Sequence, residues 1–103
     1  MTNVSFAAPL PSWMVLSDDG VTVTLKHKAN LNGVVTDKLT IRAPSVKDVM
    51  ASKVAGNGDH EQVELHLFCS LLTATKEELM ALKYKDYMRL QAGYFRLVEE
   101  DDV

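Results

Sequence analysis

Two side chains in this sequence are spaced as a pair of metal ligands would be. His66 and Cys69 stand three residues apart in a stretch that predicts a helix, which places both on one helix face. A complete site needs one or two further ligands, and His27, His60 and Glu61 are only loose candidates. The string HEQVE is not the HExxH zinc pattern, because its fifth residue is glutamate. A lone cysteine in an apolar run usually packs as a small hydrophobic side chain, so we expect no metal and no other cofactor.

The other polar residues form no pattern that catalysis requires. No serine lies in a GxSxG turn, and the sequence has no glycine-rich phosphate loop. The acidic pairs Asp18-Asp19 and Glu77-Glu78 lie in a predicted turn and in the first turn of a predicted helix, where negative charge is favourable without any catalytic role. We therefore predict that the chain is not an enzyme.

Length and charge narrow the class of protein further. The 103 residues suit one small domain, and the formal net charge is −3 from 11 basic and 14 acidic residues. Four of the acidic residues follow Val98, so the rest of the chain is almost neutral. No basic patch favours nucleic acid, and no apolar run approaches the roughly 18 residues of a membrane span. The single cysteine cannot form an internal disulfide, and a cytoplasmic location is the simplest expectation.

The first residues of the chain differ from the rest. Residues 1–19 show no helical or strand period, and two prolines and a final DDG sequence predict an extended N-terminal arm. The arm is too apolar for a plain linker. Trp13 could dock on the core of its own domain, or the arm could dock on a partner or a neighbouring subunit.

Two alternating stretches, residues 21–28 and 34–42, predict a β-hairpin. Directly opposite residues of an antiparallel pair lie on the same face of the sheet. A two-residue Asn32-Gly33 turn would mix the apolar and polar faces, so we predict a three-residue loop over residues 31–33, with a five-residue loop as the other choice that keeps the faces matched. The predicted cross-strand pairs are Leu25 with Leu39, Val23 with Ile41, and Lys26 with Lys38.

Capping signals predict where the following helices begin. The helix-start pairs are Ser45 with Asp48, Asp59 with Gln62, and Thr75 with Glu78. The first helix ends at the link Gly56-Asn57-Gly58, and the second is apolar on more than one face, which is typical of a helix covered from several sides. The apolar stripe of the first helix consists of Val46, Val49, Met50 and Val54. A short third helix and a last helix near residues 85–98 complete the chain.

Together these elements predict an α+β fold, an N-terminal β-hairpin followed by three or four helices packed against it. We expect an extended arm over residues 1–19, a single α+β domain over 20–98 with Phe68 in its core, and an acidic tail over 99–103.

Some apolar residues exceed what the core of so small a monomer explains. They lie in the arm, in the broad apolar helix and on the aromatic last helix, and tyrosine is favoured at protein interfaces. The alternative is that aromatic residues at helical spacing form the core. We expect self-association and a protein partner. The candidate partner-binding residues are Trp13, Met14, Tyr84, Tyr87, Met88, Tyr94 and Phe95.

Several short motifs occur here in a characteristic order. The hairpin leads into an R-x-P-[TS]-V-x-D turn, an L-x-x-L step follows later, and the last helix carries D-Y-x-x-L-Q. The matching residues are Arg42, Pro44, Ser45, Val46, Asp48, Leu79, Leu82, Asp86, Tyr87, Leu90 and Gln91. In this order the chain resembles, over about residues 9–98, the tail assembly chaperone family of contractile-tailed phages and prophages, Mu-like and related. The Gly56-Asn57-Gly58 link departs from that family.

The resemblance implies a small protein in the cytoplasm of the bacterial host that binds the phage tape measure protein. Such a chaperone would keep that long helical chain soluble until the tail tube forms around it. The alternative function is a small structural subunit of the tail or baseplate that is retained in the virion.

Overall fold

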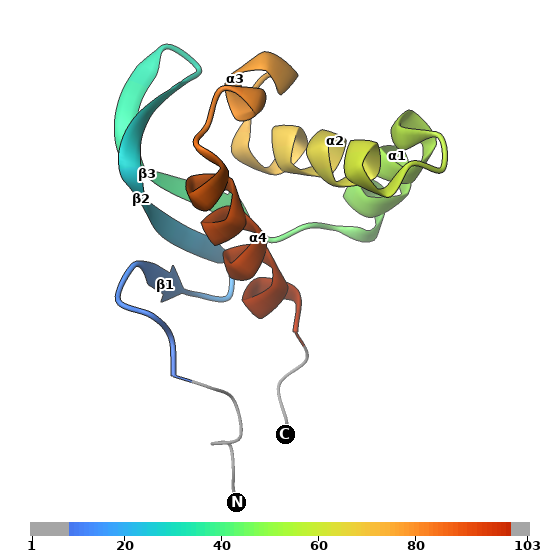
Figure 1. Ribbon diagram of the computed structural model, residues 1–103. Coiled ribbons are helices and arrows are strands. Elements are labelled where there is room, and N and C mark those ends of the chain that lie inside the picture. The colour runs from blue at the N-terminus through green and yellow to red at the C-terminus, as the bar shows by residue number, and fades with distance from the viewer. Residues whose placement is uncertain (1–8, 100–103) are drawn as a thin grey trace, which may run out of the picture.

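The structure, a computed structural model, describes residues 9–99 and places a three-stranded antiparallel sheet beside a layer of four helices (Figure 1). The strands are β1 (Met14–Leu16), β2 (Gly20–Leu31) and β3 (Val34–Arg42). The helices are α1 (Val46–Gly56), α2 (His60–Leu72), α3 (Lys76–Met80) and α4 (Tyr84–Val98). The predicted α+β fold is confirmed. Residues 1–8 of the predicted arm and 100–103 of the predicted acidic tail lie outside the described residues.

The strand β1 was not expected from the sequence, because three residues are too few to show a period. It pairs antiparallel with β2, with Met14 opposite Val23 and Leu16 opposite Val21. The backbone N–H of Ser17 donates to the carbonyl of Gly20 at 2.9 Å and closes the turn between the two strands. The part of the predicted arm next to the hairpin is therefore an edge strand of the sheet.

The hairpin turn is a two-residue Asn32-Gly33 turn, so the predicted three-residue loop is wrong. Both turn residues have positive φ, 54° and 78°, as the tight hairpin turn between right-twisted strands requires. The cross-strand pairs are Leu31 with Val34 at the turn, then, further down the strands, Thr24 with Lys38, Val23 with Leu39 and Val21 with Ile41. The pairing is interrupted between these two regions. There, four residues of β2 (25–28) lie opposite one residue of β3 (37), which forms a β-bulge. Below the bulge, Val21 and Val23 face Ile41 and Leu39 on the buried side of the sheet, as the alternation predicts, although the register differs.

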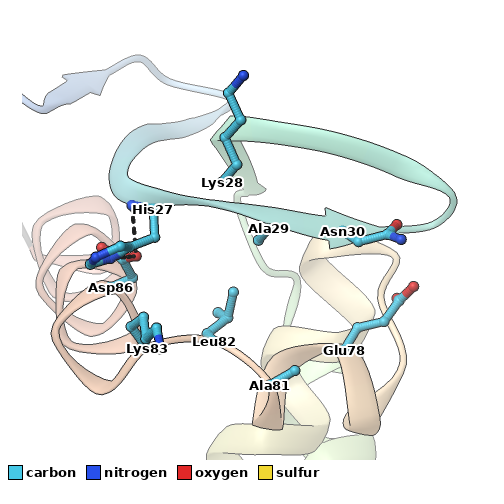
Figure 2. A pocket seen from close by; sticks show the side chains of 9 residues that line it. All are labelled: His27, Lys28, Ala29, Asn30, Glu78, Ala81, Leu82, Lys83 and Asp86. Atoms are coloured by element: carbon cyan, nitrogen blue, oxygen red, sulfur yellow. Dashed lines mark hydrogen bonds and ion pairs between the residues drawn. The ribbon is translucent and has the colours of Figure 1, made fainter.

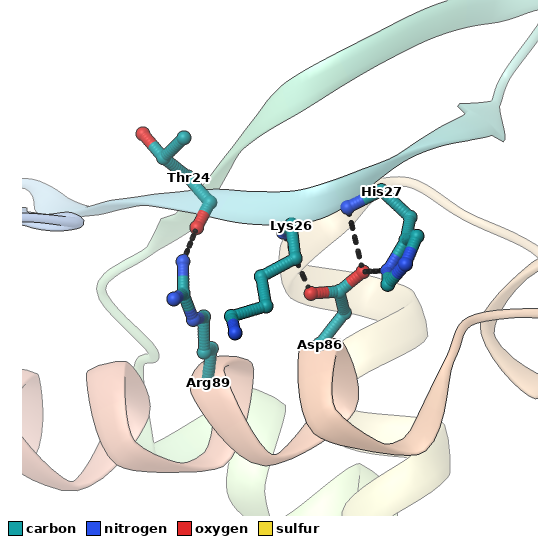
Figure 3. A network of polar contacts seen from close by, with 5 residues as sticks. All are labelled: Thr24, Lys26, His27, Asp86 and Arg89. Atoms are coloured by element: carbon teal, nitrogen blue, oxygen red, sulfur yellow. Dashed lines mark hydrogen bonds and ion pairs between the residues drawn. The ribbon is translucent and has the colours of Figure 1, made fainter.

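A buried carboxylate from the last helix holds this bulge. Asp86 is 1% exposed, and its side chain accepts hydrogen bonds from the backbone N–H groups of Lys26 at 2.8 Å and His27 at 3.1 Å (Figure 3). The ring Nδ1 of His27 lies 3.2 Å from the same carboxylate. Burial opposes ionisation of Asp86, but these hydrogen bonds outweigh it and hold its pKa below the ordinary value. Asp86 thus satisfies two backbone donors that the interrupted strand pairing leaves without partners.

The core lies between the inner face of the sheet and the helices α2 and α4. Phe68 of α2 is fully buried, and its ring centre lies 5.8 Å from that of Tyr87 and 5.4 Å from that of Tyr94. Gly93 lets α4 approach β2, since a Cβ there would lie 2.8 Å from a methyl group of Val23. The other fully or nearly fully buried residues include Val21, Leu25, Leu39, Ile41, Leu71 and Leu90. The expected position of Phe68 is confirmed.

The junction between β3 and α1 is held by the predicted capping box and by one further ion pair. Ser45 accepts from the backbone N–H of Asp48, and Asp48 accepts from that of Ser45. The guanidinium of Arg42 donates to both carboxylate oxygens of Asp48, at 2.8 and 3.1 Å. That ion pair, together with the capping bonds, holds the pKa of Asp48 far below its ordinary range.

The helices α1 and α2 form a close antiparallel pair. They approach closely at Gly56, where a Cβ would lie 2.6 Å from the backbone nitrogen of Val63. Asn57 follows in the left-handed conformation and ends α1. Of the apolar residues predicted to form one stripe on α1, only Val49 packs against the core, whereas Val46, Met50 and Val54 are exposed.

The short helix α3 links the helical layer to the tip of the hairpin. Its predicted capping box is present, with Thr75 accepting from the backbone of Glu78 and Glu78 accepting from that of Thr75. The second oxygen of Glu78 accepts from the backbone N–H of Asn32 in the turn at 2.9 Å. The same carboxylate therefore begins a helix and anchors the hairpin.

Candidate partner-binding surface

The residue pair that suggested a metal site gains no further ligand in the fold. Among residues 9–99 no group of three or more histidine, cysteine, aspartate or glutamate side chains lies close enough together to hold a metal ion. Burial raises the pKa of the Cys69 thiol, as do nearby carboxylates. At neutral pH Cys69 is therefore a protonated thiol beside the core, which makes it a poor nucleophile and a poor metal ligand.

A small cavity lies under the β2 bulge, bordered by α3 and by the start of α4. Its volume is about 180 Å³, below the range of about 300 to 1,000 Å³ that is typical of ligand sites. Figure 2 shows Asp86 directed at His27 and Glu78 beside Asn30 in its lining. Both carboxylates accept backbone hydrogen bonds, so we interpret this cavity as a packing gap around structural contacts.

An exposed apolar stripe on the outside of the helical layer runs along α4. Tyr84, Met88, Phe95 and Val98 are 74%, 49%, 61% and 45% exposed, and the half-buried Gln91 lies between them. These five residues recur at alternating intervals of four and three, the spacing of a helix that packs along another helix. We call this stripe the α4 seam.

Apart from the exposed Lys85, most of the rest of α4 packs within the molecule. Asp86, Leu90 and Gly93 are buried on the side opposite the seam, against the sheet. Tyr87 and Tyr94 face Phe68, and Arg89 stacks on Trp13. The seam is thus an apolar face of α4 that residues 9–99 leave uncovered.

The structure divides the seven predicted partner-binding residues into two groups. Tyr84, Met88 and Phe95 lie together on the α4 seam. The other four pack inward. Met14 is 5% exposed in the core, and Trp13, Tyr87 and Tyr94 are half-buried against it.

Two of the inward-facing residues make specific contacts. The guanidinium carbon of Arg89 lies 4.7 Å from the ring centre of Trp13, which fits the hypothesis that Trp13 docks on its own domain. The hydroxyl of Tyr87 donates to Glu64 at 2.7 Å, and burial together with that carboxylate raises the pKa of Tyr87 well above its ordinary value. Both contacts hold α4 in place.

A groove next to the seam was not anticipated from the sequence. It has a volume of about 530 Å³ and lies between α2, α3 and the start of α4. Its apolar lining is Leu65, Leu79, Met80, Leu82 and Tyr84, and its polar lining is Glu61, Gln62, Glu64, Tyr87 and Gln91. No lysine or arginine is among these lining residues, so the groove has a mixed apolar and polar lining with two carboxylates, Glu61 and Glu64, on α2.

A second exposed apolar surface lies on α1. Val46, Met50 and Val54 are 76%, 61% and 82% exposed and recur every four residues along one face of the helix. We call them the α1 face. Lys47 and Lys53 are exposed and lie on either side of it, each about 60° around the helix from the centre of the face. The sequence shows this stripe, but its periodicity alone indicates burial and cannot say that α1 turns it outward.

No helix among the described residues is long and apolar enough to cross a membrane. A side-chain hydrogen bond links α3 to α2: the Nζ of Lys76 donates to the Oε1 of Gln62 at 2.9 Å. Among the described residues, the exposed apolar stripes that run along helices lie on α1 and α4.

Comparison with known proteins identifies a protein family. The family model described as "Phage tail assembly chaperone proteins, E, or 41 or 14" matches residues 22–99, which include β3, all four helices and all but the first two residues of β2. None of the curated proteins and none of the solved structures matches the chain. Because the match spans most of the chain, the protein belongs to the phage tail assembly chaperone family.

Proposed function

We propose that this protein binds the phage tape measure protein through the α4 seam and keeps it soluble in the cytoplasm of the bacterial host during tail assembly. The observation that carries this proposal is the exposed stripe Tyr84, Met88, Gln91, Phe95 and Val98 with its alternating intervals of four and three. A long helical partner with an apolar stripe of the same spacing would pack along such a seam. Membership of the family supports a protein partner in tail assembly.

The size of the seam favours many weak contacts over one strong contact. Full burial of a large apolar side chain contributes about 1.5–3 kcal/mol, and the apolar seam residues are 45% to 74% exposed, so each can contribute only part of that. Association also costs translational and rotational freedom, so a single copy on a single helix would bind weakly. Copies bound side by side along one long chain would cover its apolar surface and prevent it from aggregating.

The test is coexpression of the tape measure protein with either the wild-type chain or the Phe95→Asp variant. Phe95 is 61% exposed, so the substitution leaves the core intact and places a charge in the middle of the seam. We expect wild type to keep the tape measure protein in the soluble fraction and Phe95→Asp to lose most of that effect. The matched control is Val35→Asp, which places the same charge on an equally exposed residue of β3, 64% exposed.

Three results would contradict the proposal. In the first, Phe95→Asp solubilises the tape measure protein as well as wild type does. In the second, Val35→Asp fails to the same degree as Phe95→Asp. In the third, purified mature tails contain this chain in stoichiometric amount, which would favour a structural subunit of the virion.

A further inference from the structure

A basic hollow borders the α4 seam at Met88. It has a volume of about 310 Å³ and lies between β2, the first half of α4 and the residue that precedes β1. Its lining residues are Trp13, Lys26, Lys85, Met88, Arg89 and Ala92. Three of these six residues are cations and none is acidic, so we call this hollow the basic recess. Because Met88 belongs to both surfaces, a partner that lies along the seam also reaches the recess.

The positive charges of the basic recess have no carboxylate partner within residues 9–99. The guanidinium of Arg89 is held in place, since it donates to the carbonyl of Thr24 at 2.6 Å and stacks on Trp13. Lys26 and Lys85 are exposed, and neither ammonium group forms an ion pair with a described residue. Figure 3 shows the side chain of Lys26 directed from β2 toward α4, beside Arg89. The recess therefore presents positive charge to a partner.

The other border of the α4 seam carries the opposite charge. Tyr84 and Gln91 of the seam also line the groove, whose carboxylates are Glu61 and Glu64 of α2. Gln91 donates to Glu64 at 2.8 Å, whereas Glu61 is exposed and forms no ion pair with a described residue. An acidic side chain of a partner would thus be attracted on the side of the recess and repelled on the side of the groove.

We propose that the helix of the tape measure protein carries acidic residues along one side of its apolar stripe, and that these residues bind in the basic recess, facing Lys26 and Lys85. This inference rests on the proposed function, since it concerns how the same partner lies on the α4 seam. A helix turned end to end would keep its apolar stripe on the seam but exchange its two sides. The charges beside the seam therefore set the direction in which the partner lies along α4.

The experiment is a competition between the wild-type chain and Lys85→Glu for the tape measure protein. The complex formed by coexpression is purified through a tag on the tape measure protein and equilibrated with an equal mixture of the two chains. Mass spectrometry then gives the ratio of the two chains in the complex. We expect wild type to exceed Lys85→Glu about fivefold at about 0.1 M salt. At about 1 M salt the ratio should fall below about twofold, because the screening length drops from about 10 Å to about 3 Å.

Two further variants control for net charge and for the position of the charge. Lys47→Glu makes the same change at the second residue of α1 that Lys85→Glu makes at the second residue of α4. Negative charge is favourable in the first turn of a helix, so both variants should fold, which circular dichroism checks. We expect Lys47→Glu to compete equally with wild type. Lys26→Gln keeps the backbone N–H that donates to Asp86 and should be outcompeted about twofold at about 0.1 M salt.

The results that overturn this inference differ from those that overturn the proposed function. If Lys85→Glu competes equally with wild type while Phe95→Asp is absent from the complex, only this inference is wrong. If wild type forms no complex with the tape measure protein, both proposals are wrong. A loss in Lys47→Glu equal to that in Lys85→Glu would reduce the effect to net charge. A severalfold gain in Glu61→Lys would show acidic residues on both sides of the partner's stripe, which contradicts the proposed direction.

The phosphates of DNA are the other ligand that these cations could attract, and a binding assay with a labelled DNA duplex separates the two. We expect no binding by the wild-type chain at about 0.1 M salt. Binding that Lys85→Glu abolishes, together with an equal ratio of the two chains in the tape measure complex, would assign the recess to nucleic acid and overturn the proposal.

Discussion

Substitution of Asp86 tests the contact on which the shape of the sheet depends. The carboxylate accepts two backbone hydrogen bonds from the β2 bulge and is 1% exposed. A hydrogen bond to a charged group contributes a net of about 1.5–3 kcal/mol, so two such bonds correspond to about 3–6 kcal/mol. The side chains of Lys26 and His27 are exposed, and water can reach the freed N–H groups in a variant. We therefore expect Asp86→Ala to lower the free energy of unfolding by about 3 kcal/mol, near the lower limit.

The assay is denaturant and thermal unfolding followed by circular dichroism. A loss of about 3 kcal/mol corresponds to a fall in Tm of at least about 12 °C for a domain of this size. Asp86→Asn keeps one acceptor oxygen and should lose about half as much. The matched control is Asp18→Ala, which removes an exposed carboxylate in a turn and should change stability by less than about 0.5 kcal/mol.

The pH dependence follows from the lowered pKa of Asp86. A carboxyl whose pKa is lower in the folded state contributes stability above the unfolded pKa, about 3.9, and loses it as the pH falls through the folded value. The difference between wild type and Asp86→Ala should therefore be constant near neutral pH and shrink below about pH 4. An Asp86→Ala variant within 1 kcal/mol of wild type at pH 7 would refute this account of the bulge.

Two further substitutions test the core and the helix pair. Phe68→Asp replaces a fully buried aromatic ring with a charged group, and loss of the ring alone costs about 3–5 kcal/mol. We therefore expect far-ultraviolet circular dichroism to show an unfolded chain. A folded variant that still binds its partner would contradict the placement of Phe68 in the core. Gly56→Ala places a Cβ 2.6 Å from the backbone nitrogen of Val63. Although alanine is the better helix former, we expect urea unfolding to show a free energy of unfolding lower by about 1–3 kcal/mol. A gain in stability would show that α1 and α2 can move apart without cost.

Local signals in the sequence predicted the elements that depend on neighbouring residues. The capping boxes at Ser45 and Thr75 are present, and the chain order of hairpin and helices is correct. Alternation also predicted the buried positions Val21, Val23, Leu25, Leu39 and Ile41 of the hairpin, whereas Val35 and His27, which alternate in step with them, are exposed. Each of these features involves residues within a few positions of each other.

The register of the hairpin could not be predicted in the same way. The predicted loop length assumed that the two strands pair without interruption, so that a loop of the wrong length would mix their faces. The Asn32-Gly33 pair instead adopts the two-residue turn that its local conformation favours. A two-residue turn alone would pair apolar with polar residues, and the bulge shifts the pairing so that apolar residues again lie opposite each other. The bulge is held by Asp86, about sixty residues away in the chain. A compensation of that kind depends on tertiary contacts and leaves no local pattern.

The motif residues that carry the family resemblance mostly hold the fold together. Arg42, Ser45 and Asp48 form the strand-to-helix junction, and Asp86 and Leu90 seat α4 on the sheet. The candidate surfaces on the outer faces of α1 and α4 consist mostly of other residues, with Val46 and Gln91 as the two exceptions. Their exposure depends on how each helix is rotated in the fold, and an apolar stripe in the sequence does not report that rotation.

The most direct measurement for the central claim is the mass, by light scattering, of the soluble complex formed when this chain is coexpressed with the tape measure protein. We predict one tape measure chain with many copies of this protein, together with loss of the complex in Phe95→Asp. If the tape measure protein stays insoluble while this chain elutes alone, the proposed chaperone activity toward that partner is wrong.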